Sequence, residues 1–304
     1  MRRHRTHILV TLTLLGLAAC QTDSATHTAM TDPDSTAIAF SGDFDGPLGL
    51  QLWSLRDYTQ SDVRGTLERV HQLGFREVEL AGTYGLEPVE FRTMLDEVGL
   101  EATSMHVSYE LLRDSIDSVL DDARALGVEF VGTAWIPHPQ GQPFTEDMAR
   151  QAAADFNRMG EAAAARGLTF FYHVHGFEFQ AGDDGNTPFD VLVAETNADN
   201  VKYEMDVFWT ALPGVDPAAL LRKYPDRWEL MHVKDMKKGW PLGDHSGSAP
   251  AEADVPVGAG QIDYAAVLRA AEEIGLDRYY IEDESTTPLD NIPLSIDYLE
   301  SIRF

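Results

Sequence analysis

The chain has 304 residues, of which 50 are acidic and 23 basic, giving a formal net charge of −27. Such a charge lacks the basic footprint that nucleic-acid-binding proteins use against phosphates, so we expect no nucleic-acid partner. The only cysteine is Cys20. An internal disulfide is therefore excluded, and the fold must be held together by its core.

Residues 1–19 are predicted to be a lipoprotein signal peptide. They combine a basic start, a short apolar run and small residues before Cys20, and the apolar run is too short to span a bilayer as a helix. The ending LAAC resembles a bacterial lipobox, in which Cys20 carries a lipid anchor; the alternative is an ordinary signal peptide with an incidental cysteine. We expect an exported lipoprotein on the periplasmic face of the membrane or at the cell surface.

Residues 20–46 are rich in Ser, Thr, Asp and Gly and show no sustained period. This composition predicts a flexible, lipid-anchored tether. The remainder, residues 47–304, has the length of a single α/β barrel domain.

From residue 48 onward, strand-like apolar runs alternate with segments of helical spacing. The predicted strands lie at 48–54, 77–82, 101–107, 128–135, 168–175, 201–207, 228–235 and 278–284. The predicted helices lie at 63–74, 88–99, 115–127, 148–167, 187–196, 216–225, 263–275 and 295–304. Several of the helices end in glycine, which favours a left-handed terminal residue.

This alternation implies parallel pairing, because each helix returns the chain to the same edge of the sheet. Eight such units predict a single (β/α)8 TIM barrel with eight parallel strands. An open doubly wound sheet is the alternative. It would be expected to carry a GxGxxG turn after the first strand, and this motif is absent there.

Polar side chains gather where the predicted strands end, which is the functional face of a barrel. Four of the histidines lie there, namely His106, His173, His175 and His232. Other candidates at these ends are Gln51, Trp53, Glu79 and Trp209, which we assign to substrate binding. The alternative for the tryptophans is packing in the barrel.

One divalent metal ion is predicted at this rim. His173, Asp206, His232 and Glu282 come from four different strands and offer two nitrogen and two oxygen ligands. This set suits manganese, zinc, cobalt or iron better than calcium. The alternative is that the paired histidines of strand 168–175 are satisfied polar groups near a surface.

The ordered segments YHVHGFEF, YEMDVFW, HVKD and IEDE, with VGAGQIDY before the last repeat, resemble the sugar phosphate isomerase/epimerase family with its xylose isomerase-like barrel. The resemblance implies that Asp206, His232 and Glu282 bind a divalent metal. Many members carry a glutamate on the fifth strand, where this chain has His173 in the manner of a "YHxH" subgroup. One carboxylate of the two-glutamate epimerase scheme is therefore missing.

The resemblance implies a metal-dependent sugar isomerase or epimerase that works through a metal-stabilised enediolate. Its candidate proton carriers are Glu282, His175, Lys234 and His106. For His175 the alternative is a hydrogen bond to a neighbouring loop, and for Lys234 it is a salt bridge. We expect Asp235 and Glu284 to support the site or cap a loop.

Other functions stay open. His173 and the predicted export favour a lyase or hydratase that uses the same metal site on a keto-sugar or 3-keto-glycoside. From another class, the chain could be a non-catalytic sugar-binding lipoprotein. Endonuclease-like hydrolysis is disfavoured by the charge, and a retaining glycosidase using Glu79 and Glu282 would leave the histidines without a role.

Overall fold

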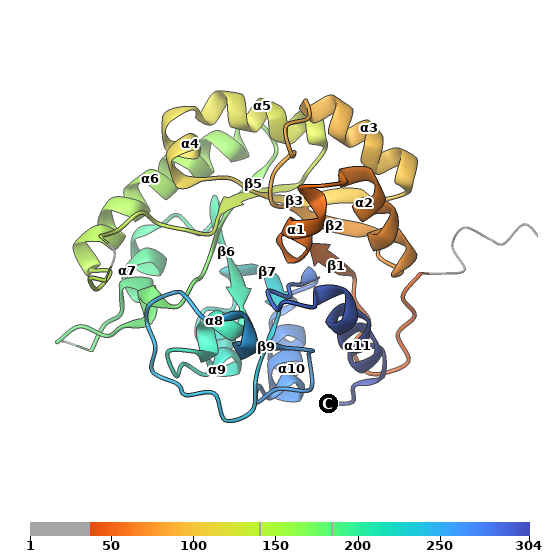
Figure 1. Ribbon diagram of the computed structural model, residues 1–304. Coiled ribbons are helices and arrows are strands. Elements are labelled where there is room, and N and C mark those ends of the chain that lie inside the picture. Colours follow the sequence, from red (N-terminus) through yellow and green to blue (C-terminus); the bar gives the residue numbers. More distant parts are fainter. Residues whose placement is uncertain (1–36, 140, 184) are drawn as a thin grey trace, which may run out of the picture. The chain divides into compact units, whose positions relative to one another are not determined.

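The computed structural model describes residues 37–139, 141–183 and 185–304, and eight parallel strands within them form a closed barrel. The strands are β1 (Leu48–Gln51), β2 (Glu77–Leu80), β3 (Glu101–His106), β4 (Phe130–Thr133), β5 (Thr169–His173), β6 (Val201–Asp206), β7 (Trp228–Val233) and β10 (Tyr279–Ile281). Each strand pairs with the next in this series, and β10 closes the barrel on β1 (Figure 1). The predicted (β/α)8 barrel is confirmed.

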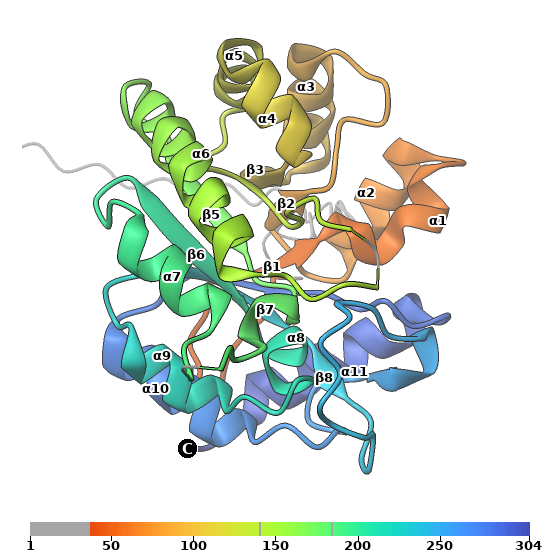
Figure 2. The ribbon, with the colours of Figure 1, turned by 90° about the vertical axis from the view of Figure 1, so that its left-hand side faces the viewer.

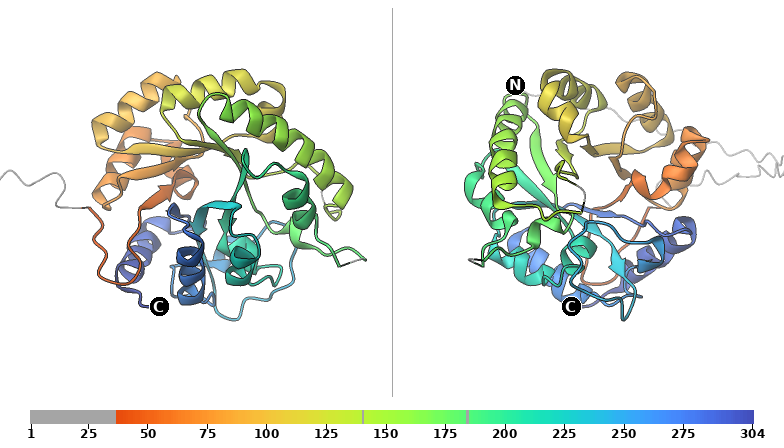
Figure 3. Two further views of the ribbon diagram at one scale, coloured as in Figure 1. Left: turned by 180° about the vertical axis from the view of Figure 1, so that it is seen from behind. Right: turned by 60° about the vertical axis from the view of Figure 1, so that its left-hand side comes forward.

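Helices connect the strands and surround them, as the views from other sides show (Figures 2 and 3). The α-helices are α1 (Arg56–Thr59), α2 (Val63–Gln72), α3 (Pro88–Val98), α4 (Tyr109–Asp114), α5 (Ile116–Leu126), α6 (Glu146–Ala164), α7 (Pro188–Glu195), α8 (Val207–Ala211), α9 (Pro217–Lys223), α10 (Tyr264–Ile274) and α11 (Pro288–Ser301). Short 3-10 turns occur at η1 (Leu52–Leu55), η2 (Phe177–Phe179) and η3 (Ala251–Ala253). After β7, the two-residue strands β8 (Asp235–Met236) and β9 (Asp254–Val255) pair in antiparallel fashion.

Local sequence signals explain where the helices begin and end. Thr187 and Asp190 form a capping box at the start of α7, in which each side chain accepts a backbone N–H of the other residue. Gly99 and Gly127 follow α3 and α5 with a φ of 84°, a left-handed conformation that glycine adopts at little cost. The glycine signals in the sequence therefore marked real helix ends.

The barrel interior changes from apolar to polar along its axis. Phe171, Leu230 and Tyr280 are buried and form one cluster inside the barrel. Two residues further along the same strand or its extension come His173, His232 and Glu282, which point to the same side because the side-chain period of a strand is two. The apolar cluster is therefore the floor beneath a polar layer at the carboxyl ends of the strands.

The segment before β1 is attached to the barrel. The backbone N–H of Ser41 donates to the carbonyl of Glu300 at 2.7 Å, that of Asp43 donates to the carbonyl of Ile302 at 2.8 Å, and Phe44 is buried. The described part of the predicted tether, residues 37–46, thus belongs to the barrel, and the domain starts earlier than the predicted residue 47. Residues 1–36, which include the predicted signal peptide and Cys20, lie outside the described residues. No helix in the described ranges is both long and apolar enough to cross a membrane.

Candidate metal centre and active site

Asp206, His232 and Glu282, from different strand ends, meet at the mouth of the barrel, and His173 lies beside Asp206. His232 Nδ1 lies 3.4 Å from Glu282 Oε2 and 3.7 Å from Asp206 Oδ2, and His173 Nε2 lies 3.9 Å from the same Asp206 oxygen. These separations exceed ordinary N–H···O distances of about 2.7–3.2 Å. They are close to the roughly 3.3–3.6 Å between neighbouring ligands on a tetrahedral ion with bonds of about 2.0–2.2 Å.

Two of these atoms are buried and have no hydrogen-bond partner among the described residues, namely Asp206 Oδ2 and His232 Nδ1. The other oxygen of Asp206 accepts the backbone N–H of Trp209 at 2.8 Å, at the start of α8. An unsatisfied buried polar atom costs about 1–3 kcal/mol. Burial alone would lower the pKa of His232, but Glu204, Glu79 and Glu282 outweigh it and raise the pKa well above its usual value. The surrounding anions therefore favour a positive charge at Nδ1, and a divalent cation in place of that proton suits these residues.

A second layer of carboxylates, just beneath, fixes the two histidine rings. His173 Nδ1 lies 2.9 Å from Glu204 Oε2, and His232 Nε2 lies 2.5 Å from Glu79 Oε1. A neutral imidazole that donates a proton to its carboxylate keeps a lone pair on its other nitrogen. Glu204 and Glu79 therefore turn His173 Nε2 and His232 Nδ1 toward the metal centre.

His106 lies between these two buried carboxylates. Its Nε2 is 2.9 Å from Glu204 Oε2 and 3.2 Å from Glu79 Oε1, and its ring stacks on that of His232 at 5.6 Å. Burial alone would lower the pKa of His106, but the two glutamates outweigh it and raise the pKa to about 10. A protonated His106 balances their charge. Hydrogen bonds of 2.5–2.9 Å account for this lower cluster without an ion.

A cavity of about 510 Å³ opens above the centre. Its walls include eight of the predicted site residues, namely Gln51, Trp53, His106, His173, His175, Trp209, His232 and Glu282. Glu79, Asp206 and Lys234 do not line it. The predicted contact of Glu79 with substrate is revised, because this side chain is fully buried and bonded to Gln51 and His232.

Lys234 forms a buried ion pair. A salt bridge was the alternative to a proton-carrying role for this residue. Its Nζ donates to Glu282 Oε2 at 3.0 Å and also to Glu284, and it lies 4.9 Å from the centre of the Trp209 ring. Burial favours the neutral amine, but the two glutamates outweigh it and raise the pKa of Lys234 well above its usual value. This lysine therefore stays charged and orients Glu282.

The model of the family described as "Xylose isomerase-like TIM barrel" matches residues 67–302. The chain belongs to this family.

The relatives found by sequence comparison include dehydratases, which are lyases by name. An inosose dehydratase of Lacticaseibacillus casei is 25% identical over 239 residues, which cover 71% of this chain and 79% of that protein. Among solved structures, a sugar phosphate isomerase/epimerase from Parabacteroides distasonis superposes with a TM-score of 0.69 at 24% identity, covering 89% of this chain and 98% of that one. The IolI protein, solved with a zinc atom, gives a TM-score of 0.63 at 16% identity and coverages of 83% and 95%. The two structures show the shared family fold.

His175 is the predicted proton carrier that remains least constrained. Its ring stacks on Trp209 at 4.7 Å, its backbone N–H donates to Glu178 at 2.9 Å, and its Nδ1 is buried without a hydrogen-bond partner among the described residues. Burial first, and then the nearby His173 and Lys234, hold the pKa of His175 well below its usual value. The alternative for His175 was a hydrogen bond from its side chain to a neighbouring loop. Its Nδ1 forms no such bond among the described residues.

Gln51 and Trp53 are both anchored at the rim. Gln51 Nε2 donates to Glu79 Oε1 at 2.6 Å, and Gln51 Oε1 accepts the backbone N–H of Trp53 at 2.9 Å. The amide of Gln51 is therefore already occupied, whereas the Trp53 indole stands in the cavity wall with 45% of its surface exposed.

Two residues of the site were missed from the sequence. Glu204 precedes Asp206 by two positions, and this spacing alone would have placed both carboxylates on one face of the strand. Trp135 lines the cavity just after β4; it is the last residue of the predicted strand 128–135, so the strand-end position used for the other candidates could have identified it. Asp235 was expected to support the site or cap a loop, and its carboxylate accepts the backbone N–H groups of Gly258 and Gly260 in a loop, each at 2.9 Å.

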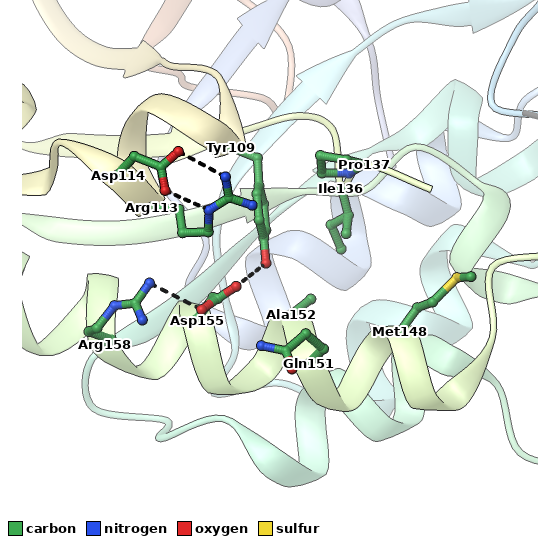
Figure 4. Close-up of a pocket in the computed structure, with 10 residues that line it drawn as sticks. All are labelled: Tyr109, Arg113, Asp114, Ile136, Pro137, Met148, Gln151, Ala152, Asp155 and Arg158. Carbon is green, nitrogen blue, oxygen red and sulfur yellow. Dashed lines mark hydrogen bonds and ion pairs between the residues drawn. The ribbon is translucent and has the colours of Figure 1, made fainter. Parts of the chain in front are cut away.

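A second cavity, of about 590 Å³, lies between α4 and α6 (Figure 4). Its charged groups are bonded to one another: Tyr109 donates to Asp155 at 2.6 Å, Arg158 pairs with Asp155 at 3.1 Å, and Arg113 pairs with Asp114 at 2.7 Å. None of the predicted site residues lines this cavity. The candidate chemistry is therefore confined to the barrel mouth.

Proposed function

We propose that this chain is a divalent-metal-dependent lyase that acts on a keto-sugar or a related keto-polyol. The observation that carries the proposal is the pairing of His173 with Glu204 on neighbouring strands. This pairing puts a histidine ligand where a two-glutamate epimerase needs a carboxylate that can take up a proton. The lyase name of the curated relatives supports the same choice.

The residues divide the work between holding the ion and moving the proton. His173, Asp206, His232 and Glu282 would hold the metal. When bound, a divalent ion supplies a Lewis acid for a substrate carbonyl oxygen, a contribution of several kcal/mol. Glu79, Glu204 and Lys234 keep these ligands in position, and they do so with contacts that are already formed in the structure.

His175 is the group we assign to the proton transfer. It lines the cavity, and its ring is held in place by stacking on Trp209 at 4.7 Å. The step begins when the imidazole takes the proton from the carbon next to the carbonyl. The electrons of that C–H bond form a carbon–carbon double bond as the β-substituent leaves. Its oxygen takes the proton back from His175 and departs as water or an alcohol. A positioned acid–base group contributes about 10²–10⁴-fold to such a step.

Epimerisation or isomerisation is the second candidate. It is favoured by the positions of His175 after β5 and Glu282 after β10, because these two strands are separated by β6 and β7 around the barrel and both residues line the cavity. Two proton carriers on different sides of a substrate could exchange a proton on either face. The proton would then return to carbon and no group would be lost.

The experiment uses the mature protein with manganese, zinc, cobalt or iron supplied, in heavy water, over a panel of keto-sugars and inososes. We expect stoichiometric metal, deuterium uptake next to the ketone, and loss of water or alcohol. Asp206→Asn should lose both metal and activity, whereas Asp57→Asn, which removes an exposed acid away from the cavity, should keep both.

Three results contradict the proposal, each in a different way. Elimination that continues after complete chelation rules out the metal role. Exchange with an epimer or isomer as the only product favours the second candidate. Tight sugar binding without exchange in any metal-loaded sample indicates a sugar-binding protein.

A further inference from the structure

Two tryptophans stand partly exposed at the cavity mouth, although most large apolar residues of the barrel are buried. Trp53 is 45% exposed and Trp135 is 41% exposed, and both line the 510 Å³ cavity. They come from different parts of the rim, since Trp53 follows β1 and Trp135 follows β4. Exposed indoles inside a concave, partly polar cavity are typical of a surface that binds a ligand.

Both indoles are held in place. The Nε1–H of Trp53 donates to Glu284 Oε1 at 2.9 Å, and the guanidinium of Arg56 lies 5.2 Å from its ring centre. Trp135 stacks on His138 at 5.1 Å and meets Phe177 edge to face at 4.9 Å. Because these rings are already ordered, a ligand that packs on them loses little additional side-chain entropy.

The cavity is therefore graded from a polar end to an aromatic end. The metal-facing residues His173, His232 and Glu282 are 2%, 0% and 8% exposed, whereas the two indoles are more than 40% exposed. The Trp135 ring meets the His175 ring edge to face at 5.3 Å, so the aromatic end begins directly beside the proposed proton carrier. The grading fits a ligand in two parts, with a polar unit inside and a ring-shaped or planar unit outside.

We propose that the substrate is a glycoside oxidised to a ketone at carbon 3, and that its aglycone packs on Trp53 and Trp135. The inference rests on the proposed lyase function and names the group that leaves. In such a glycoside the proton on carbon 2 is next to the ketone, and the glycosidic oxygen on carbon 1 is the β-substituent.

The elimination balances without any further reactant. The C2–H bond and the C1–O bond break, and a double bond forms between carbon 1 and carbon 2. The proton from carbon 2 ends on the glycosidic oxygen, so the aglycone leaves as an alcohol or phenol. No electrons are gained or lost overall. The leaving group would lie toward the open, aromatic end of the cavity, from which it can depart.

The test compares 4-nitrophenyl 3-keto-glucoside, methyl 3-keto-glucoside and free 3-keto-glucose as substrates of the metal-loaded mature protein. We expect the aryl glycoside to have the highest kcat/KM. Trp135→Ala should lower its kcat/KM about tenfold more than it lowers that of free 3-keto-glucose, mainly through KM. Trp135→Phe should retain most of the preference. Tyr58→Ala serves as the control, because Tyr58 is a similarly exposed aromatic (40%) that does not line the cavity.

Equal losses for all three substrates in Trp135→Ala, or a wild type without preference for the aryl glycoside, would overturn the inference. Calorimetric titration with unoxidised 4-nitrophenyl glucoside, which lacks the ketone, tests the aromatic subsite separately from the proposed lyase function. Binding that depends on Trp135, in a protein that eliminates nothing, supports the aromatic subsite and refutes the lyase. Elimination of keto-sugars together with binding that does not depend on Trp135 refutes the subsite alone.

Discussion

The carboxylate of Glu204 offers the sharpest single perturbation of the proposed centre. It is fully buried, and its Oε2 is 2.9 Å from both His106 Nε2 and His173 Nδ1. The variant Glu204→Gln keeps the shape of the side chain and removes its charge. An amide oxygen can still accept one N–H, but it holds the imidazole of His173 less firmly than a carboxylate does.

The size of the effect follows from these contacts. Weakening the partner of a metal-bound histidine typically lowers metal affinity by about 10–100-fold. Loss of one member of a buried charged cluster costs about 3–5 kcal/mol of stability, and of the two anionic partners that His106 has among the described residues only Glu79 would remain. We therefore expect a metal Kd raised at least about tenfold and a free energy of unfolding lowered by about 3 kcal/mol.

The assay is a calorimetric metal titration combined with urea unfolding of the same samples. Glu178→Gln is the matched control, since Glu178 is equally buried but bonds to Tyr172 and the backbone of His175 instead of a metal-facing ring. Its metal Kd should stay within about twofold of the wild type. A Glu204→Gln protein that loses stability but binds metal like the wild type would refute the orienting role of Glu204.

Three further predictions concern other parts of the chain. Burial raises the pKa of Glu178 to about 7. The protonated carboxyl of Glu178 therefore stabilises the fold fully below its unfolded-state pKa near 4.5, and this stabilisation is lost as the pH rises through 7. In urea unfolding, the wild type should lose about 3 kcal/mol over this pH range that Glu178→Gln does not lose. Gly42→Ala should cost about 1–3 kcal/mol, because a Cβ would come within 2.2 Å of the Ile302 carbonyl oxygen, and unchanged stability would contradict the docking of this segment. Cys20→Ser should move the protein from the membrane fraction to the soluble fraction, and a variant that stays with membranes would contradict lipidation.

The fold could be predicted from the sequence because its signals are local. The apolar runs of the strands, the helical spacing between them and glycines such as Gly99 and Gly127 all act within a few residues. The predicted start of the domain, residue 47, lies too far along the chain because the preceding segment lacks such local signals. Phe40 and Phe44 have no periodic neighbours, and their packing depends on the far end of the chain, near Tyr279.

The site could be predicted only in outline. Alternation along the strands brings His173, Asp206, His232 and Glu282 to one rim, but depth within the barrel depends on strand stagger. The register of β2 on β3 shifts between Val78 and Glu79, and Glu79 lies below the cavity. Pattern alone does not give this shift.

The central claim is that four side chains bind one metal ion at the barrel mouth. Its most direct test is a crystal structure of the metal-loaded protein with anomalous diffraction measured at the absorption edge of the metal. The account predicts one ion bonded to His173 Nε2, Asp206 Oδ2, His232 Nδ1 and Glu282. An ion held instead in the lower cluster of His106 and Glu204, or no stoichiometric ion under saturating metal, would contradict it.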